Sequence, residues 1–459
     1  MGPAHHLGSL TAMTDKPHIL VIGGGYVGMY TALRLQKKLR RGEATVTVVD
    51  PQNHMTYQPF LPEAAAGSVE PRHVVVPLRP VLRRCQVLTG RVTSIQHSRR
   101  VAVLQPVEGE PLEIPYDVLV AAPGSVSRTL PIPGLAEGGI GFRTIGEAIY
   151  LRNHVLSRLD FAASTTDEQR RRKALTFVFV GGGYAGIEAF AELEDMARYA
   201  TRYYSEVDPA DMRWVLVEAA GRILPEVSLP MADYTTKQLL GRGMEIRLNT
   251  RLVSMADGHV VLDDGEEFDA ETVVWTAGVR ANPMLARTDL PLDDKGRLVC
   301  TPELQVRDTP GAWSAGDSAA VPDLTRLDKD PHALTGPSAQ HAVRQSKRLA
   351  DNILASLRHR RVQPYRHAYV GSVASLGLHK GVAEVYGVKL RGWPAWLMHR
   401  SYHLSRMPTL NRKVRVIMDW TLALFFRREV VALGQLQQPR REFELAAQPE
   451  HEVQLPTGT

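Results

Sequence analysis

Blocks of hydrophobic and polar residues near the start of the chain predict a strand, a helix and a second strand. The apolar run 19–22 is typical of a buried parallel strand. An apolar-periodic stretch at 30–39 predicts a helix, and the apolar run 44–49 predicts a strand that ends at Asp50. The pattern indicates the opening of an α/β domain with helices packed on a parallel sheet.

Three glycines connect the first strand to its helix. Gly23, Gly25 and Gly28 have the spacing of a dinucleotide-binding fingerprint, which Asp50 completes. Gly23 permits a tight turn, Gly25 admits a pyrophosphate to the backbone, and Gly28 allows close helix–strand packing. Free N–H groups at the helix N-terminus favour phosphate, and Asp50 can accept hydrogen bonds from an adenosine ribose. These residues, 18–50, are called the first fingerprint below.

The pattern returns later in the chain as a second fingerprint, residues 175–218. It consists of the apolar run 175–180, the glycines Gly181, Gly183 and Gly186, a helix to about Tyr199, and a strand that ends at Glu218. Two further strands end in glycine at matching places of the copies, at Gly124 and Gly278. We therefore predict two Rossmann-like dinucleotide-binding domains.

The regions between the fingerprints divide into elements of different kinds. Residues 86–122 alternate as β-strands do and predict a β-rich crossover. Asp317 follows another apolar run and has two compatible interpretations, a helix N-cap and a carboxylate that holds a cofactor's sugar-like chain. Residues 338–357 predict a helix with Gln340 and Arg344 on one face.

Prolines exclude a long helix from the segment 51–62. Two interpretations stay open for this segment: a stretch that runs along the cofactor, and an ordinary surface loop. We expect the first domain to comprise two parts of the chain, 17–135 and 286–384, and the second domain to span 136–285. A C-terminal helical region follows at 385–435, and the ends 1–16 and 436–459 are expected to be disordered.

Composition narrows the class of protein. The 459 residues suit two to three domains, and a hydrophobic content of 44% is ordinary for a globular protein. Cys85 and Cys300 lie far apart, so we expect no disulfide framework and no cysteine-based metal site, which suits a reducing cytoplasm. No apolar run reaches the roughly 18 residues of a membrane-spanning helix, and residues 1–16 do not have the pattern of a signal peptide.

The stretch 385–428 is strongly basic and aromatic. It carries nine Lys or Arg residues against one acid, Asp419, interleaved with Trp and Phe. Helices of this kind lie in the interface of an anionic membrane. Nucleic-acid binding and packing of the aromatic side chains on the body of the protein are the alternatives.

Nine stretches carry a resemblance to a known family, in family order from residue 20 to about 383. They are VIGGGYVG, YQPFLPE, YDVLVAAPGS, VFVGGGYAGIE, VEAAGRILP, VVWTAGV, WSAGDSA, AQHAVRQ and GSVASLGLHKG. Together they resemble the flavoproteins with two dinucleotide-binding domains, and within these the type II NADH:quinone oxidoreductases.

The resemblance implies two cofactors and their binding residues. It implies FAD in the first domain at Gly23, Gly25, Gly28, Asp50 and Asp317, and NADH in the second at Gly181, Gly183, Gly186 and Glu218, with Gly124, Gly316 and Gly278 as further cofactor-binding candidates. Independently, Glu218 would repel the 2′-phosphate of NADPH and accept hydrogen bonds from the free hydroxyls of NADH. Arg222 lies close enough in sequence to oppose this preference.

Four further residues stand at family positions near the flavin and the quinone, and we treat them as catalytic candidates: Glu188, Gln340 and Lys380, which match the family residues, and Arg344, which does not. The family pattern Ala-Gln-x-Ala-x-Gln is altered here, because Arg344 replaces the second Gln and Gln345 follows one place late. Gln345 would point about 100° away on the helix. A surface Glu and a solvated Lys are the alternatives for Glu188 and Lys380.

The resemblance implies hydride transfer from NADH to flavin, then transfer of two electrons to a membrane quinone, expected to be menaquinone, without proton pumping or a metal. A quinone in the bilayer favours membrane binding by 385–428 over nucleic-acid binding, at the cytoplasmic face of the membrane, with a homodimer as a further option. The alternatives are a soluble NADH reductase with another acceptor, a sulfide:quinone oxidoreductase, and a cofactor-binding protein without useful turnover. For the second of these, Cys85 and Cys300 look misplaced.

Overall fold

The computed structural model describes residues 16–367, 371–433 and 444 of the chain. The two ends expected to be disordered, 1–16 and 436–459, lie outside the described residues apart from Lys16 and Glu444.

The first fingerprint folds into a strand, a helix and a second strand, as predicted. Strand β1 (His18–Ile22) lies between its parallel neighbours β2 (Thr45–Asp50) and β8 (Val118–Ala121). Helix α1 (Tyr26–Lys38) begins at Tyr26 and not at the predicted residue 30. Gly28 therefore lies inside the first turn of the helix. The error in the predicted start arises because glycine is unfavourable in helix interiors and was assigned to the turn.

The sheet that contains β1 has seven strands within the described residues, in the order β20-β8-β1-β2-β5-β6-β7. Its remaining strands are β5 (Gln86–Gln96), β6 (Val101–Pro106), β7 (Leu112–Pro115) and β20 (Ala312–Trp313). Strands β5, β6 and β7 pair in antiparallel fashion and confirm the predicted β-rich crossover. Strand β20 pairs with β8 from almost two hundred residues further along the chain, so two separate stretches build this unit.

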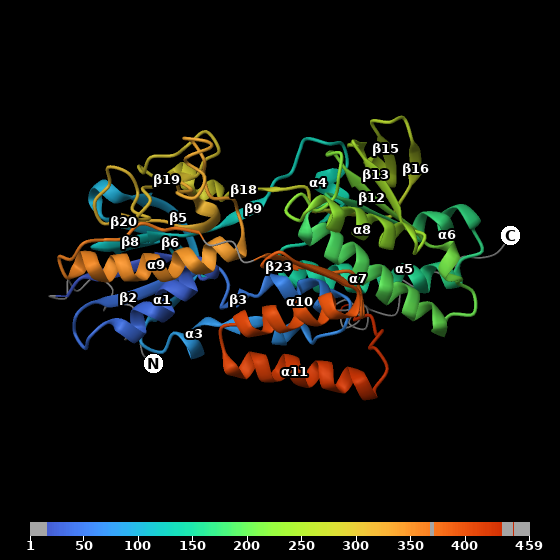
Figure 1. Cartoon of the computed structure of the whole chain (residues 1–459), viewed down its shortest axis with the longest axis horizontal. Coiled ribbons are helices and arrows are strands. Elements are labelled where there is room, and N and C mark those ends of the chain that lie inside the picture. Colours follow the sequence, from blue (N-terminus) through green and yellow to red (C-terminus); the bar gives the residue numbers. More distant parts are fainter. Residues whose placement is uncertain (1–15, 368–370, 434–443, 445–459) are drawn as a thin grey trace.

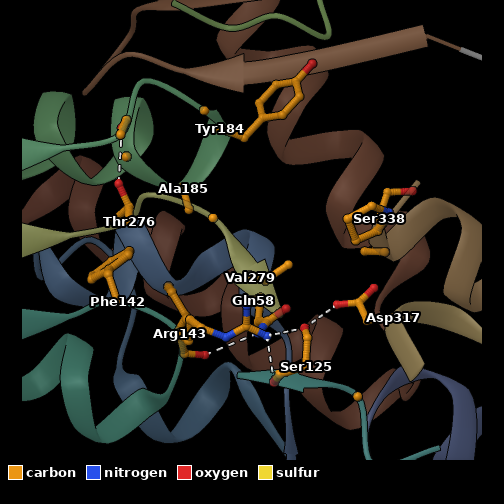
Figure 2. Close-up of a pocket in the computed structure, with 18 of the residues that line it drawn as sticks. Gln58, Ser125, Phe142, Arg143, Tyr184, Ala185, Thr276, Val279, Asp317 and Ser338 are labelled. Atoms are coloured by element: carbon orange, nitrogen blue, oxygen red, sulfur yellow. Dashed lines mark hydrogen bonds between the residues drawn. The ribbon is translucent and has the colours of Figure 1, made fainter. Parts of the chain in front are cut away.

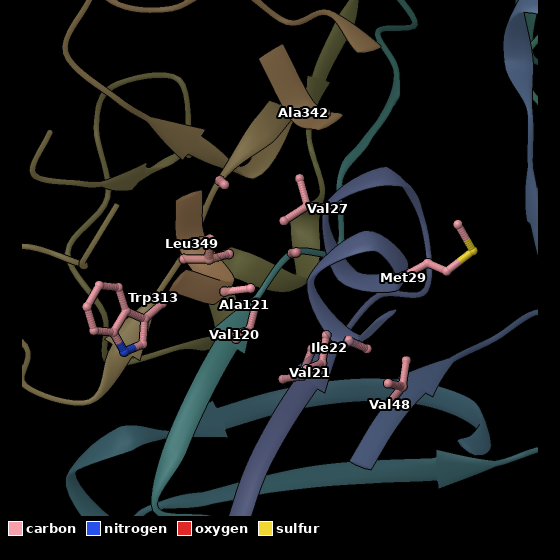
Figure 3. Packing of buried hydrophobic residues seen from close by; sticks show 14 of the residues in the cluster. Val21, Ile22, Val27, Met29, Val48, Val120, Ala121, Trp313, Ala342 and Leu349 are labelled. Carbon is pink, nitrogen blue, oxygen red and sulfur yellow. The ribbon is translucent and has the colours of Figure 1, made fainter. Parts of the chain in front are cut away.

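The core of this unit is shared by its early and late segments. Helix α9 (Ala339–Leu357) confirms the helix predicted over 338–357, and it packs beside α1 (Figure 1). Leu349 of α9 and Trp313 of β20 lie against Val120 and Ala121 of β8 in the buried cluster (Figure 3). Because these side chains are almost fully buried, the late segment supplies part of the first unit's hydrophobic core.

The second fingerprint repeats this topology. Its parallel sheet has the order β10-β17-β11-β12-β13, formed by β10 (Gly139–Gly141), β11 (Thr176–Val180), β12 (Arg213–Glu218), β13 (Glu245–Leu248) and β17 (Thr272–Trp275). Strand β11 lies between β17 and β12, as β1 lies between β8 and β2. Helix α7 (Tyr184–Ala200) follows β11 as α1 follows β1.

Two short strands join the units. Strand β9 (Ser125–Ser127) follows Gly124, β18 (Val279–Ala281) follows Gly278, and the two pair in antiparallel fashion. They cross between the two halves of the molecule in Figure 1. The two units are therefore linked at equivalent points, where the corresponding strands of each sheet end.

The other elements cover the sheets or connect them. The remaining strands are β3 (His54–Thr56), β4 (Val75–Pro77), β14 (Leu252–Ser254), β15 (His259–Leu262), β16 (Glu267–Asp269), β19 (Leu298–Val299), β21 (Ala319–Ala320), β22 (Gly371–Ser375), β23 (Gly381–Val385) and β24 (Val388–Arg391). The remaining α-helices are α2 (Leu61–Ala65), α3 (Leu78–Val81), α4 (Leu135–Gly138), α5 (Ile145–Ser164), α6 (Glu168–Ala174), α8 (Leu229–Leu240), α10 (Trp393–Arg406) and α11 (Leu410–Phe425).

The C-terminal region contains the two expected helices, but they differ in burial. Helix α10 packs against β22 and β23 and buries Trp396, His399 and Arg400. Helix α11 lies outermost in Figure 1 and buries only Val416 among its residues. Of the stretch 385–428, α10 therefore packs on the body of the protein, as one of the alternatives had it, and binding to a membrane stays a prediction.

The outward side of α11 and the residues after it expose large apolar side chains. They are Leu410, Val414, Ile417, Met418, Leu422, Leu424, Phe425 and Phe426, called the α11 apolar surface below. Trp420 points the other way and donates a hydrogen bond to Glu63 Oε2 at 2.9 Å. In the described part of the chain, no helix has both the length and the hydrophobicity needed to cross a bilayer.

We expect Leu349→Ala to lower the free energy of unfolding by about 2–5 kcal/mol, because it removes a fully buried side chain from the first unit's core. Chemical denaturation, followed by circular dichroism, measures the effect. Leu240→Ala on α8 is the control: its side chain is 49% exposed, and the change should stay within about 0.5 kcal/mol. Equal effects of the two substitutions would contradict the shared core.

Candidate functional site

A cavity of about 1520 Å³ lies between the two units. Residues of both fingerprints line it, together with residues from the segment 54–62, from α9 and from α10. Pockets for one drug-sized ligand typically measure about 300–1,000 Å³, so this cavity can hold more than one such group. Of the two interpretations of the segment 51–62, the cavity supports the one in which it runs beside a cofactor.

The glycines of the first fingerprint have the geometry that a dinucleotide requires. Gly23 has a φ of +97°, which favours glycine, and a Cβ there would overlap the carbonyl oxygen of Ala122. A Cβ on Gly28 would overlap the carbonyl oxygen of Gly23, so α1 packs tightly on its own turn. Gly25, which lines the cavity, has no other atom within 4 Å of its Cβ position. The space beside Gly25 fits the approach of a pyrophosphate.

The second fingerprint reproduces this geometry residue by residue. Gly181 has a φ of +115°, and a Cβ on Gly186 would overlap the carbonyl oxygen of Gly181. Gly183 lines the cavity and again has open space at its Cβ position. The sequence therefore builds two equivalent glycine turns that leave space for a pyrophosphate in one cavity. They are called the first cradle (23–28) and the second cradle (181–186) below.

The acids that end β2 and β12 are held in the same way. Asp50 accepts hydrogen bonds from the N–H groups of Gly24 at 2.6 Å and Gln52 at 2.7 Å. Glu218 accepts from the N–H groups of Gly182 at 2.5 Å and Ala220 at 2.7 Å. Burial raises the pKa of Asp50 above its usual value, against the effect of these hydrogen bonds. Both carboxylates line the cavity at the position of a ribose-binding acid.

A polar chain crosses the cavity wall between β9 and the late segment (Figure 2). Ser125 Oγ donates a hydrogen bond to Asp317 Oδ2 at 2.5 Å, and Arg143 donates to Ser125 Oγ at 2.9 Å. Asp317 lies in a 3₁₀ turn and caps no helix, so of the two readings of this residue the N-cap is wrong. Asp317 instead lines the cavity, as do Gly124 and Gly278.

Arg143 is a cavity residue that the sequence reasoning missed. Burial lowers its pKa below the usual value, although the carboxylates of Asp317 and Glu147 oppose this. Its main-chain N–H donates to Glu147 Oε2 at 2.8 Å, within the capping box that starts α5 at Thr144. The capping box was a readable signal, because it places Arg143 at a helix start, where anions bind.

The end of the cavity next to α10, called the α10 end below, is lined by Glu188, Gln340, Ser372, Tyr402 and His403. Gln340 Nε2 donates to the carbonyl oxygen of Gly371 at 2.9 Å, whereas its Oε1 is buried without a hydrogen-bond partner among the described residues. The buried hydroxyl of Tyr26, also on the cavity wall, is in the same condition. Unpaired buried polar atoms are costly, so these two fit a site that binds a polar ring system such as a flavin or a quinone.

Two of the catalytic candidates lie away from the cavity wall. The Nη1 atom of Arg344 is 3.1 Å from Nδ1 of His367, and Lys380 Nζ is 3.4 Å from Asp195 Oδ1. Neither Arg344 nor Lys380 is among the residues that line the cavity. The structure thus brings together Glu188 and Gln340 but not the other two.

Three further sequence-predicted residues act behind the cavity wall. Gly28 serves the packing of α1, and Gly316, with a φ of +67°, forms the turn before Asp317. Gln345 is fully buried, and its Oε1 accepts from the N–H of Gly316 at 2.7 Å. Gln345 therefore holds the turn that presents Asp317 and does not face the α10 end.

Tyr402, His403 and the buried His399 of α10 were also missed. The sequence analysis treated 385–428 as one basic and aromatic stretch, so it did not separate the residues of α10 that line the cavity or lie behind its wall. Among the described residues, no group of three or more His, Cys, Asp or Glu side chains is placed to hold a metal ion.

Comparisons with known proteins agree with this geometry. A type II NADH:quinone oxidoreductase of Mycobacterium tuberculosis is 27% identical over 434 residues, covering 91% of this chain and 90% of the relative. A demethylphylloquinone reductase of Synechocystis is 28% identical over 419 residues, covering 89% and 96%. The solved structure of NDH2 from Plasmodium falciparum in complex with NADH has the same fold, with a TM-score of 0.83, 16% identity, and coverage of 91% of this chain and 100% of that one.

The family model for pyridine nucleotide-disulphide oxidoreductases matches residues 17–346, about 70% of the chain. These similarities confirm the expected resemblance, the α/β fold with two dinucleotide-binding units, and the pair of cofactors, FAD and NADH, that the resemblance implies. The chain therefore belongs to the pyridine nucleotide-disulphide oxidoreductase family.

Proposed function

We propose that this protein oxidises NADH and passes two electrons through FAD to a membrane quinone. The observation that carries the proposal is the single cavity, which joins two equivalent dinucleotide cradles to the α10 end. NADH, the flavin and the quinone can then lie in contact with one another in this order, so electrons need no separate path between two sites. The relatives named as NADH:quinone oxidoreductases and as a demethylphylloquinone reductase support a quinone as the acceptor.

We assign FAD to the first unit. Asp50 and Asp317 both line the cavity, where they would hold the ribose and the ribityl chain. Flavin, when bound, supplies hydride acceptance and electron transfer. The chain's part is to hold and orient the ring, through Gly25 at the pyrophosphate and Gln340 near the α10 end.

We assign NADH to the second unit. Glu218 would accept hydrogen bonds from the ribose hydroxyls and repel a 2′-phosphate. The guanidinium of Arg222, which could have favoured NADPH, donates to the carbonyl oxygens of Pro225 and Val227 and does not line the cavity. This placement supports NADH over NADPH.

The sulfide:quinone alternative requires reactive sulfur at the flavin. Burial raises the pKa of the Cys85 thiol to about 11 and raises the pKa of Cys300 still further. Neither thiol lines the cavity. Because the thiolate is the reactive form of cysteine, these residues are poorly suited to carrying sulfur, and the structure favours the NADH reaction.

We propose that the protein binds peripherally to the cytoplasmic face of the membrane through the α11 apolar surface. Arg412, Lys413 and Arg415 lie on the same helix, and each can add roughly 1 kcal/mol of attraction to anionic lipid. A quinone, menaquinone in our proposal, would enter from the bilayer at the α10 end. Donor and acceptor share one cavity, so we propose transfer without proton pumping.

Steady-state assays test the proposed acceptor. NADH oxidation by the FAD-loaded protein should be slow with oxygen alone and at least tenfold faster with a soluble menaquinone or ubiquinone analogue, and NADPH should be a poor donor. Absorbance of NADH measures the rates. Fast oxidation by ferredoxin or oxygen, with no effect of quinone, would support the soluble-reductase alternative.

We expect Gly183→Ala to impair NADH binding without unfolding the protein. Its Cβ would meet nothing in the cofactor-free chain but would occupy the space beside the pyrophosphate. The KM for NADH should rise at least tenfold while flavin content and thermal stability stay near those of the wild type. Gly186→Ala is the matched contrast, since its Cβ overlaps the Gly181 carbonyl and should lower stability. Loss of flavin from Gly183→Ala would contradict the assignment of cofactors.

The combined substitution of Leu424, Phe425 and Phe426 by Ser should weaken membrane binding at least about tenfold, because it removes three apolar side chains from the α11 apolar surface. Sedimentation with phosphatidylglycerol-containing vesicles measures the partition coefficient. The control replaces Leu229, Leu240 and Val253 of the second unit, whose side chains are also exposed, by 47–57%. Equal sedimentation of the two triple variants would show that α11 is not the contact.

A further inference from the structure

A buried histidine of α10 faces the carboxylate of Glu188 from behind the cavity wall. His399 Nε2 lies 3.0 Å from Glu188 Oε1, an ion-pair contact in which the ring nitrogen is not aligned for a hydrogen bond. The same oxygen accepts a hydrogen bond from the N–H of Ser375 at 2.9 Å. The exposed fraction of His399 is 1% and that of Glu188 is 7%, and only Glu188 lines the cavity. The two residues are more than two hundred positions apart, so the fold brings them together at the cost of burying two ionisable groups.

The neighbouring charges are already paired with other groups. Glu63 of α2 forms an ion pair with Arg400 of α10 at 2.9 Å. Glu192 of α7 accepts a hydrogen bond from Ser375 Oγ at 2.6 Å and lies 3.6 Å from Arg428. These pairings leave His399 as the basic group that faces Glu188.

The titration of His399 follows from these neighbours. Burial by itself lowers the pKa of His399, but the adjacent Glu188, with Glu63 and Glu192 further away, raises it above the ordinary value of 6.5. The ring of His403, 4.6 Å away between centroids, is held neutral because burial lowers its pKa well below the ordinary value. Burial raises the pKa of Glu192 to about 7.

The position of α10 is fixed by contacts on either side of His399. The guanidinium of Arg400 lies 4.0 Å from the ring centre of Trp396 and 4.7 Å from that of Trp420. The carbonyl oxygen of His403 accepts a hydrogen bond from the Tyr57 hydroxyl at 2.8 Å. With both neighbouring turns held, His399 has little freedom to leave Glu188.

Quinone reduction by NADH consumes one proton, because NADH + H⁺ + quinone gives NAD⁺ + quinol. NADH supplies both electrons and one hydrogen as hydride, so the second proton comes from water, and a side chain on the cavity wall can relay it to a quinone oxygen. Glu188 is a carboxylate on the wall of the α10 end, where the proposed quinone would lie.

We propose that Glu188 and His399 form a proton-delivering pair, in which Glu188 passes a proton to the quinone oxygen and His399 replaces it. The proton moves from His399 Nε2 to Glu188, then from Glu188 to the oxygen, and the pair regains one from water before the next turnover. His399 is thus a positioning residue that acts through Glu188, and α10 completes the site. This inference rests on the proposed quinone reduction.

Anaerobic stopped-flow measurements of the two half-reactions test the pair in the FAD-loaded, full-length protein. In His399→Gln and Glu188→Gln, flavin reduction by NADH should be unchanged, while reoxidation by a menaquinone analogue should slow by about 10²-fold or more. The double variant should be no slower than the slower single variant, because the two residues act as one unit. Additive losses in the double variant would overturn the pairing.

The pH dependence gives a second readout with a defined sign. His399 loses its proton as the pH rises through its raised pKa, so wild-type reoxidation should be fastest below that pKa and fall at pH values above 6.5. The fall should disappear or shift in His399→Gln. An unchanged pH profile would show that His399 has only a structural role.

His97→Gln is the control for the loss of a buried histidine. His97 contacts the Tyr116 hydroxyl and the carbonyl oxygen of Pro310, away from the cavity. This variant should lose stability without a change in the pH profile of either half-reaction.

A titration by NMR of the imidazole signals tests the contact without turnover. The pKa of His399 should fall in Glu188→Gln, because the main group that raises it is neutralised. This measurement decides the question even if His399→Gln fails to fold, and an unchanged pKa would overturn the proposal. If the wild-type protein is not reoxidised by quinone at all, the proposed function fails whatever the NMR result.

Discussion

Two close contacts between a helix and its own preceding turn determine the rest of the structure. At Gly28 and at Gly186 the helix lies so near the backbone of Gly23 or Gly181 that only glycine fits. This contact points the N-terminus of each helix into the cavity and brings Gly25 and Gly183 to the surface of a cradle. Because the same constraint operates twice, and β9 pairs with β18 between the units, the two cradles open into one space.

Much of this arrangement could be predicted from local sequence. The glycine spacing, the apolar runs and the terminal acids Asp50 and Glu218 depend on residues close together in the chain, and periodicity and turn chemistry describe such residues well. The role of α10 depends on contacts between distant segments, which no local pattern records, whereas Arg143 stands beside a local capping box that marks a helix start. The substitution of Arg344 for a family Gln was visible in the sequence, but its position off the cavity wall was not.

The C-terminal region shows why composition alone misled the interpretation. Both α10 and α11 carry basic and aromatic side chains, yet Arg400 is buried between Trp396 and Trp420 and neutralises Glu63. A buried arginine is tolerated only when it is paired and hydrogen-bonded. Its partner Glu63 lies in a short helix far away in sequence. The composition of a stretch therefore cannot distinguish a basic helix that packs in the body of the protein from one that lies on its surface.

The central claim is that one cavity conducts electrons from NADH through FAD to a quinone. The most direct measurement is the flavin absorbance of the FAD-loaded protein under anaerobic conditions, first with NADH and then with a menaquinone or ubiquinone analogue. The account predicts bleaching by NADH and rapid recovery on addition of the quinone. Bleaching without recovery by any quinone would contradict the claim and leave a flavoprotein with a different electron acceptor.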